Sequence, residues 1–348
     1  MTLVDWVIVV LRVALPALIF PALVIPLTWV ERRGAAFIQD RFGPNRVGPF
    51  GLFQAVADAV KMFTKEAVMP ANADKLLFLL APAIAAFAAL STFAIVPYGA
   101  TLKIDGREIP LIGADVSIGI LYSFAIVSLS VYAIVLAGWA SNNKFSLMGG
   151  IRSSAQIISY ELAMTTAAAG VVLVASSFKL NDIIAAQQRP MPILAFVPQW
   201  NIFIQPLGFI IFLVSAFAET NRLPFDLPEA EPELVAGYHT EYSAMRFGAF
   251  QMAEYVNVVV ACAITVTLYL GGWSLPGFHP ESILGVAVSI LIFATKTALL
   301  VWVFVWVRWT LPRFRYDQLM RLGWKVLLPL ALVNLFWAAA LEMVRAAR

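Results

Sequence analysis

Four ionisable side chains interrupt long apolar stretches of the sequence and are the first candidates for chemistry. They are Glu161, Glu219, Glu254 and Lys296. An ionised side chain at membrane depth costs at least ~2.5–3.5 kcal/mol, so such residues are functional candidates by default. A carboxyl group in a low dielectric can exchange a proton near neutral pH, and a series of them would make a proton path. The alternative is a buried Glu–Lys pair that only locks helices together.

Acidic residues also gather in the loop 219–248, between two apolar runs. They include Glu229, Glu231 and Glu233. A charge run of this kind is usually a solvated loop. Here prolines and apolar side chains are interleaved with the acids, so we expect the loop to pack against the rest of the chain. A packed acidic loop that continues into Glu219 would form an entrance funnel for protons.

The loop 31–74 has the opposite character, because its first part is rich in arginine. Arginines just outside an apolar helix ordinarily set membrane topology, and the Gly-Pro-Asn segment at 43–45 indicates a tight turn. Neither G-x-x-x-x-G-K-[ST] nor G-x-G-x-x-G occurs here, so the sequence does not support nucleotide binding by this chain.

Metal and redox cofactors are not expected in this chain. Its only cysteine is Cys262, and its only histidines are His239 and His279. Zinc, haem and iron–sulfur sites need clustered cysteine and histidine ligands, which this set does not provide.

The elements that must position these residues are transmembrane helices. Apolar residues make up 61% of the 348 residues and charged residues only 13%, which is about half the charged fraction of a soluble protein. A bilayer core requires ~20 apolar residues per helix. Runs of that kind predict eight spans, at 4–30, 75–98, 114–139, 155–176, 200–219, 248–270, 282–307 and 323–344. We therefore expect an all-α polytopic membrane protein, residues 1–348 forming one domain, with no nucleic-acid partner.

Charge and periodicity add an orientation and a surface helix. Odd-numbered loops hold fourteen Lys and Arg residues, against six in the even-numbered loops and at the far end. Cytoplasmic loops accumulate positive charge, which predicts cytoplasmic long loops and periplasmic termini. Within 51–66, Leu52, Val56, Val60 and Phe63 recur at helical spacing. This segment is too short to span, so we expect an amphipathic helix on the membrane surface, either a simple anchor or the wall of a doorway for something lipidic.

Four long segments give the chain a family resemblance. They read ERRGAAFIQDRFGPNRVGPFGLFQAVADAVKMFTKE (31–66), SAQIISYE (154–161), AETNRLPFDLPEAEPELVAGYHTEYSAM (218–245) and PRFRYDQLM (312–320). In this order they resemble the signature segments of the quinone-chamber membrane subunit of bacterial respiratory complex I, the equivalent of the mitochondrially encoded subunit one. The resemblance runs through nearly the whole chain and includes the eight-span plan.

The resemblance implies a membrane subunit of a proton-pumping NADH:quinone oxidoreductase with no redox centre of its own. It would join the membrane arm to the peripheral arm in a bacterial inner membrane. It would also shape a chamber through which quinone reaches an iron–sulfur cluster in a neighbouring subunit. Small neighbouring membrane subunits and the lipid bilayer would be its other partners.

The resemblance also implies roles for individual residues. Chamber or entrance positions are matched by Arg32, Gln39, Arg41, Asp58 and Arg308, and the acidic loop facing the chamber by Glu229, Glu231 and Glu233. The buried carboxylates of the first proton passage are matched by Glu161, Glu219 and Glu254, and a lysine near them by Lys296.

Two other functions remain open at this point. A stand-alone ion-coupled transporter would suit the intramembrane carboxylates, although paired Gly/Pro-interrupted helices in two similar halves are absent. The second alternative is the membrane anchor subunit of a related hydrogenase, which shares its ancestry with the complex I subunit but handles no quinone.

Overall fold

A computed structural model gives the fold for residues 3–104, 107–189, 198–227, 235–278, 280 and 282–346, and the following statements concern these residues. The first half contains α1 (Leu3–Ile38), η1 (Pro49–Gly51), α2 (Gln54–Thr64), α3 (Lys75–Phe93), α4 (Gly119–Ala140) and α5 (Lys144–Ala175). The second half contains α6 (Leu180–Gln187), α7 (Asn201–Ile204), α8 (Pro206–Glu219), η2 (Gly237–His239), α10 (Ala244–Tyr269), α11 (Ile283–Thr310), α12 (Tyr316–Leu322), η3 (Gly323–Leu327) and α13 (Leu328–Ala346).

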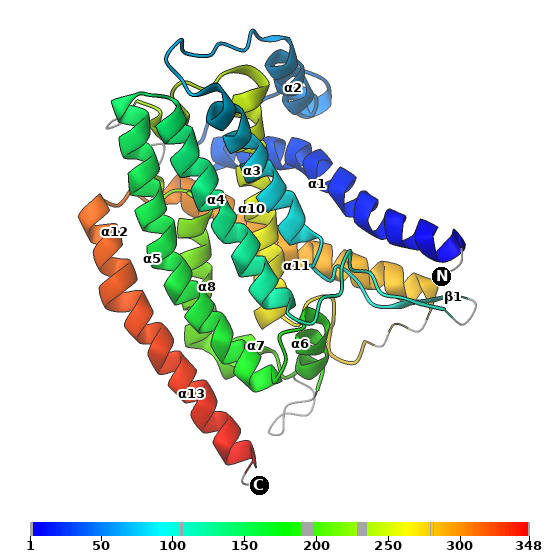
Figure 1. Cartoon of the computed structure of the whole chain (residues 1–348). Coiled ribbons are helices and arrows are strands. Elements are labelled where there is room, and N and C mark those ends of the chain that lie inside the picture. Colours follow the sequence, from blue (N-terminus) through cyan, green and yellow to red (C-terminus); the bar gives the residue numbers. More distant parts are fainter. Residues whose placement is uncertain are drawn as a thin grey trace.

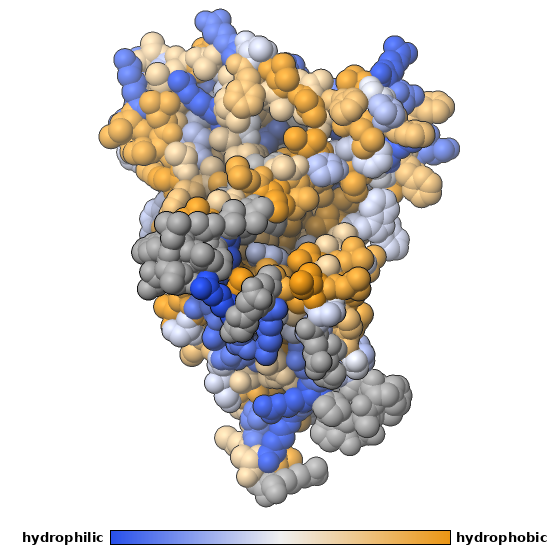
Figure 2. Space-filling model, turned by 90° about the vertical axis from the view of Figure 1, so that its right-hand side faces the viewer, coloured by the Kyte–Doolittle hydropathy of each residue, from blue (hydrophilic) through white to orange (hydrophobic). Residues whose placement is uncertain are grey.

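The long helices lie side by side in a bundle with distinct ends. In Figure 1, α2 and the long loops lie at the upper end, whereas α6, α7 and β1 lie toward the opposite end. Helix α1 slants away from the bundle on one side, and α13 runs along the other side. Figure 2 shows hydrophobic side chains over much of one face, with hydrophilic side chains protruding at its upper end.

The helical membrane class predicted from the sequence is confirmed. Among the described residues, six helices are long and apolar enough to cross a membrane: α3, α4, α5, α10, α11 and the continuous stretch Tyr316–Ala346. The other two expected spans fall in α1 and in α7–α8, of which α8 has only 14 residues. The count of eight crossings therefore stays a prediction.

One pair of short strands departs from the all-α expectation. Strand β1 (Leu102–Ile104) pairs antiparallel with β2 (Arg107–Ile109), and Lys103 lies opposite Glu108. The sequence between the strands is Asp105-Gly106, a strong hairpin signal. Only three residues belong to each strand, which is too short to show as an alternating pattern in an apolar sequence.

Helix ends are capped as the local sequence dictates. The Asp74 carboxylate accepts hydrogen bonds from the backbone N–H groups of Leu76 and Leu77, and Asn143 accepts one from Phe145. These side chains satisfy N–H groups that the helix itself leaves unpaired. Because Asn143 caps α5, this helix begins well before the apolar run predicted at 155.

Small residues let the helices approach closely, which is how membrane helices gain packing contacts. The faces of α3 and α4 bury Ala81, Ala85 and Ala137. A Cβ added at Gly138 of α4 would lie 2.6 Å from the Ser146 carbonyl oxygen, and one at Gly149 of α5 would lie 2.8 Å from the Gly237 Cα. These contacts leave no room for a larger side chain, and they seat the η2 turn directly against α5.

A buried polar network joins α13 to the bundle. The Asn334 amide donates to Gln205 Oε1 at 3.0 Å, and the Gln205 amide donates to the Gly170 carbonyl oxygen at 3.0 Å. In a lipid environment, hydrogen bonds of this kind contribute about 0.6–2 kcal/mol each. The network fixes α13 against α5 and α8, and thus fixes the helices that carry the candidate carboxylates.

Candidate functional site

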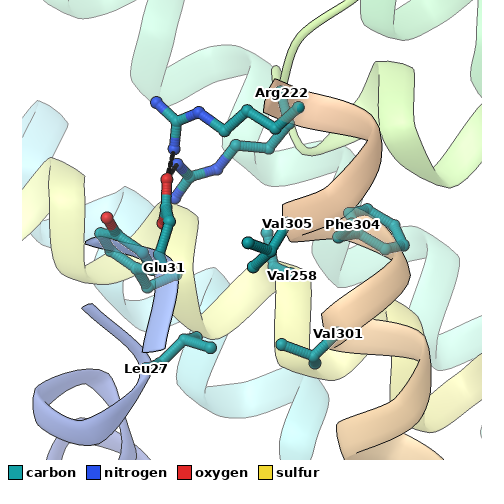
Figure 3. Close-up of a pocket in the computed structure, with 9 residues that line it drawn as sticks. Leu27, Glu31, Arg222, Val258, Val301, Phe304 and Val305 are labelled. Carbon is teal, nitrogen blue, oxygen red and sulfur yellow. Dashed lines mark hydrogen bonds and ion pairs between the residues drawn. The ribbon is translucent and has the colours of Figure 1, made fainter. Parts of the chain in front are cut away.

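A buried ion cluster lies where α1, α11 and the loop after α8 meet (Figure 3). Glu31 of α1 is only 7% exposed, and its carboxylate accepts a hydrogen bond from the Arg308 guanidinium of α11. Arg222 Nη1 lies 3.6 Å from Glu31 Oε1, and Arg222 is also 7% exposed. Two guanidinium groups therefore share one carboxylate in an enclosed place.

Tyr255 of α10 completes the ion cluster, which we define as Glu31, Arg222, Tyr255 and Arg308. The Arg222 guanidinium carbon lies 4.4 Å from the centre of the Tyr255 ring, and Tyr255 also hydrogen-bonds with Glu31. Such stacking holds the planar guanidinium in one orientation. Breaking a buried pair of this kind by removing one partner typically costs about 3–5 kcal/mol, so the ion cluster ties α1 to the bundle.

The walls around the ion cluster are apolar. They are formed by Leu27, Val258, Val301, Phe304 and Val305, and they enclose a cavity of ≈ 20 Å³. A cavity needs roughly 10–15 Å³ to hold one water. This space therefore holds about one water and is far too small for a quinone ring.

The predicted chamber residues of the first loop lie beside the ion cluster and beyond it. Arg32 Nη1 contacts Asp58 Oδ2 at 2.6 Å, which ties the end of α1 to α2. Arg41 Nε donates to Gln39 Oε1 at 2.7 Å in the exposed turn that follows α1. The structure thus places Arg308 in the ion cluster, Arg32 and Asp58 at the α1–α2 junction, and Gln39 with Arg41 on the surface.

The α1–α2 end of the molecule also presents a large exposed apolar surface. Phe42 is 92% exposed and Phe63 is 70% exposed. The predicted stripe of α2 is exposed as a whole at Leu52, Val56, Val60 and Phe63. Because α2 turns this stripe away from the bundle, the stripe is available to lipid or to another chain. An interfacial position for α2 remains a prediction.

The predicted membrane carboxylates do come together. Glu161 of α5 accepts a hydrogen bond from the Ser128 hydroxyl of α4, and Glu161 is near enough to Glu219 of α8 for the two carboxyl groups to interact electrostatically. Glu219 lines a cavity of ≈ 30 Å³ together with Thr220 and Asn257. This volume has room for one or two waters, and apolar side chains such as Phe124, Met164 and Phe212 form most of the remaining wall.

A second small cavity extends the series to Glu254 of α10. It measures ≈ 20 Å³, and its lining includes Glu219, Thr220, Asn257, Glu254 and Tyr238. Tyr238 donates a hydrogen bond from its hydroxyl to Glu254 Oε1 at 3.3 Å. Glu219 and Asn257 border both cavities, and Glu161 interacts electrostatically with Glu219. We call Glu161, Glu219 and Glu254, with the two cavities, the carboxylate line.

Lys296 does not lie in the carboxylate line. Its ammonium group donates to the carbonyl oxygens of Leu270, Gly272 and Ser274 at 2.7, 3.0 and 2.7 Å. Leu270 follows the last residue of α10 and comes sixteen residues after Glu254, which is about 24 Å along a helix at about 1.5 Å per residue. The expectation of a lysine near the carboxylates is not met by these contacts.

The carbonyl contacts of Lys296 satisfy a helix end. Lysine has three N–H donors and no acceptor, and all three find carbonyl oxygens at the end of α10. The ring of Trp200 lies beneath the ammonium, with its centre 4.4 Å away. Cations are favourable at helix C-termini, where the carbonyl groups lack partners.

The acidic loop is described only in part. Glu229, Glu231 and Glu233 lie outside the described residues. The loop's first residues are firmly held, since Gln156 of α5 donates to the carbonyl oxygens of Ala218 and Phe225 at 2.7 Å each. Asp226 forms an ion pair with Arg313 at 2.8 Å. The predicted packing of the loop is therefore seen at its beginning.

Two groups outside the membrane spans have shifted titration. Burial raises the pKa of the Tyr242 phenol in the loop before α10. At the opposite end of the bundle, a hydrogen bond and ion pair with Asp115 at 2.9 Å raise the pKa of Lys179. Both groups keep their protons at neutral pH. Within the described residues, no group of three or more His, Cys, Asp or Glu could hold a metal ion.

Comparison with known proteins decides the family. Residues 10–339 match the family model described as NADH dehydrogenase. The chain belongs to this family. It is 50% identical over 334 residues to an NADH-quinone oxidoreductase H subunit of Geobacter metallireducens, covering 96% of both chains. It is 51% identical over 324 residues to an NADH-quinone oxidoreductase H subunit of Geobacter sulfurreducens, covering 93% of both.

Membership of the NADH dehydrogenase family confirms the resemblance drawn from the four sequence segments. It does not test the individual residue roles. Sequence reasoning missed Glu31, Tyr255, Tyr238 and Ser128 as members of the site. Glu31 carried a usable signal, because it is an acid at the end of an apolar run, directly before the arginines that set topology. The tyrosines and the serine carried none, since such residues are common in membrane helices and in the loops between them.

Proposed function

We propose that this chain is the membrane subunit of a bacterial proton-pumping NADH:quinone oxidoreductase that forms part of the quinone chamber and couples quinone reduction to proton translocation. The observation that carries the proposal is the pairing of the ion cluster with the carboxylate line in a member of the NADH dehydrogenase family. The subunit sits in the inner membrane with its long loops in the cytoplasm and both termini in the periplasm.

The chamber is proposed at the α1–α2 end. Its walls are apolar at Leu27, Val301 and Phe304, which suits a quinone and its tail. The cavity of ≈ 20 Å³ at the ion cluster cannot hold a quinone, so the quinone binds between this chain and partner subunits. The iron–sulfur subunit of the peripheral arm supplies the electrons. The polar members of the chamber are Arg32, Gln39, Arg41, Asp58 and Arg308.

The ion cluster and the carboxylate line are joined by two short pieces of chain. Glu219 belongs to the line and Arg222, three residues later, belongs to the ion cluster. Likewise Glu254 borders the line and its neighbour Tyr255 borders the ion cluster. Arg222 is therefore only three residues from Glu219 along the chain, and Tyr255 only one residue from Glu254. A change of position or charge at Arg222 or Tyr255 can affect these carboxylates through the short pieces of chain between them.

This connection gives a physical route for coupling. Reduction of a quinone to a quinol takes up two electrons and two protons. Negative charge forms in the poorly solvated chamber until the protons arrive, and such a charge alters the proton affinity of nearby carboxyl groups. The ion cluster carries one carboxylate against two guanidinium groups, so it responds to any negative charge that forms beside it. Protons then move along the carboxylate line, with the acidic loop as the supply. The carboxylates of this path are Glu254, Glu219 and Glu161 in the line, and Glu229, Glu231 and Glu233 in the loop.

Isolation of the tagged chain from gently solubilised membranes tests this proposal. The chain should co-purify with NADH dehydrogenase and iron–sulfur subunits, together with small membrane subunits, and the preparation should reduce quinone with NADH. Co-purification with hydrogenase subunits and no quinone reductase activity would replace the proposal with the anchor function. Isolation of the chain alone, with ion transport in vesicles, would replace it with a transporter.

A further inference from the structure

The carboxylate line has one member that is not a carboxylate. Tyr238 lies in the η2 turn, eleven residues beyond Leu227, the last described residue of the first part of the acidic loop. Its side chain is only 2% exposed. Tyr238 lines the same ≈ 20 Å³ cavity as Glu219, Glu254 and Asn257, and its hydroxyl donates to Glu254 Oε1 at 3.3 Å. A phenol thus joins the loop to the membrane carboxylates.

The η2 turn holds the Tyr238 ring in this position. Gly237 has φ +61° and its Cα would lie 2.8 Å from a Cβ at Gly149 of α5, so the turn sits directly on that helix. The Ser146 hydroxyl donates to the Gly237 carbonyl oxygen at 3.3 Å. Phe250 packs edge-on against the Tyr238 ring, with 5.3 Å between ring centres. Backbone and ring contacts together leave the hydroxyl aimed at the cavity.

We propose that Tyr238 passes protons between the acidic loop and Glu254, and so is the positioning and relay residue at the loop end of the carboxylate line. A phenol oxygen can donate its own proton to the Glu254 carboxylate while it accepts another from a water or carboxyl group on its loop side. At the phenol oxygen one O–H bond breaks and one forms, while the donor loses an O–H bond and Glu254 gains one, so the phenol is neutral before and after the transfer. This inference rests on the proposed proton path.

The chain offers a matched control four residues away. Tyr242 is also buried and packs edge-on against the same Phe250, with 5.0 Å between ring centres. It stacks on Phe78 at 4.0 Å. Its hydroxyl has no hydrogen-bond partner among the described residues and does not line the cavity of Glu254. Tyr238→Phe and Tyr242→Phe therefore remove the same atom from the same aromatic cluster, but only the first removes it from the carboxylate line.

The experiment compares Tyr238→Phe, Tyr242→Phe and Glu254→Gln in the membrane-bound complex. NADH:ferricyanide activity, which does not need quinone, measures assembly. Quinone reductase kcat, the KM for quinone and the solvent deuterium isotope effect on kcat are then determined. Tyr238→Phe should lower kcat about tenfold and enlarge the isotope effect, with the KM and ferricyanide activity unchanged. Tyr242→Phe should match the wild type, and Glu254→Gln should be at least as impaired as Tyr238→Phe.

Three other outcomes would each overturn a specific part of the proposal. Wild-type turnover in Tyr238→Phe with a defect in Glu254→Gln would remove Tyr238 from the path and leave the path in place. Wild-type turnover in both variants would overturn the proton path itself, and Tyr238 with it. A parallel loss of ferricyanide activity in Tyr238→Phe would give the hydroxyl a folding role and overturn the relay.

Discussion

At the scale of single residues, the molecule contains two kinds of acid–base pair that look alike in sequence. Glu31 contacts Arg308 and Arg222 with a side chain that is almost fully buried, whereas Asp58 contacts Arg32, whose side chain is 51% exposed. Exposed pairs contribute ~0–1 kcal/mol because water competes with them. Buried pairs cost several times more to break, because water compensates little for a counter-charge that is lost in a low dielectric.

The first prediction compares these two acids. Glu31→Gln removes the carboxylate that both guanidinium groups of the ion cluster contact, and it should destabilise the subunit by about 3–5 kcal/mol. Asp58→Asn should cost less than about 1 kcal/mol. Both effects are measured from the melting temperature of the solubilised complex, with the release of this subunit as the signal for melting. Equal melting temperatures would mean that the ion cluster adds little to the attachment of α1.

The second prediction concerns Glu219, which borders both cavities of the carboxylate line. Glu219→Gln keeps the volume and much of the hydrogen bonding but removes the proton-exchanging group, so assembly should survive while coupled turnover falls about tenfold or more. Glu219→Asp should do less harm. Quinone reductase activity and membrane-potential formation in vesicles, both normalised to assembled complex, give the comparison.

Glu342→Gln is the control for Glu219→Gln. Glu342 pairs with Arg345 near the end of α13 and is far from the carboxylate line in the sequence and in the bundle. It should behave as the wild type. If Glu219→Gln also pumps at the wild-type rate, Glu219 serves only to end α8, and the proton path must run through Glu161 and Glu254 without it.

At the scale of elements, the sequence predicted the helices well and their mutual contacts poorly. Hydropathy located α3, α10 and α11 within a few residues, because each is a long and predominantly apolar run between charged loops. It placed the start of α5 too late, since the cap at Asn143 comes before the residues turn apolar. Composition could not show which faces of the helices meet. The position of Lys296 relative to the carboxylates could therefore not be predicted from the sequence.

The third prediction follows from the contacts of Lys296. Lys296→Met removes three hydrogen bonds to carbonyl oxygens at the end of α10, and each such bond to a charged group is worth about 1.5–3 kcal/mol. The melting temperature of the complex should fall clearly, while protons pumped per quinone reduced should stay unchanged in the complex that remains. A variant of normal stability with impaired pumping would instead return Lys296 to the proton path.

The fourth prediction tests α2 as an element. Its stripe at Val56, Val60 and Phe63 is exposed in this chain, and burying a side chain of this size is worth about 1.5–3 kcal/mol. Val60→Asp should therefore weaken attachment at the membrane surface or to a partner, and NADH:quinone activity should fall more than NADH:ferricyanide activity. Lys61→Asp changes the charge on the other face and is the control. Equal effects of Val60→Asp and Lys61→Asp on NADH:quinone activity would show that neither lipid nor a partner chain covers the stripe.

At the scale of the whole molecule, the loops at the two ends of the bundle differ in their residues. One end carries α2, the α4–α5 turn and the acidic loop, and the other carries the β1–β2 hairpin, α6 and the cap of Lys296 (Figure 1). The ion cluster and the loop end of the carboxylate line belong to the first end. The proposed function draws protons and electrons from the cytoplasm and therefore requires this end on the cytoplasmic side, which is also the orientation that the lysine and arginine counts predict.

The last prediction tests this orientation directly. Cys262 is the only cysteine of the sequence and is buried, so Cys262→Ser gives a background without reactive thiols. In that background, Asn142→Cys places a thiol in the α4–α5 turn and Lys103→Cys places one in the β1–β2 hairpin. A membrane-impermeant maleimide added to intact spheroplasts should label Lys103→Cys but not Asn142→Cys, and inverted vesicles should reverse the pattern. The opposite labelling pattern would mean that the chain has the reverse orientation in the membrane. The acidic loop would then lie in the periplasm, and the carboxylate line would have no cytoplasmic proton supply.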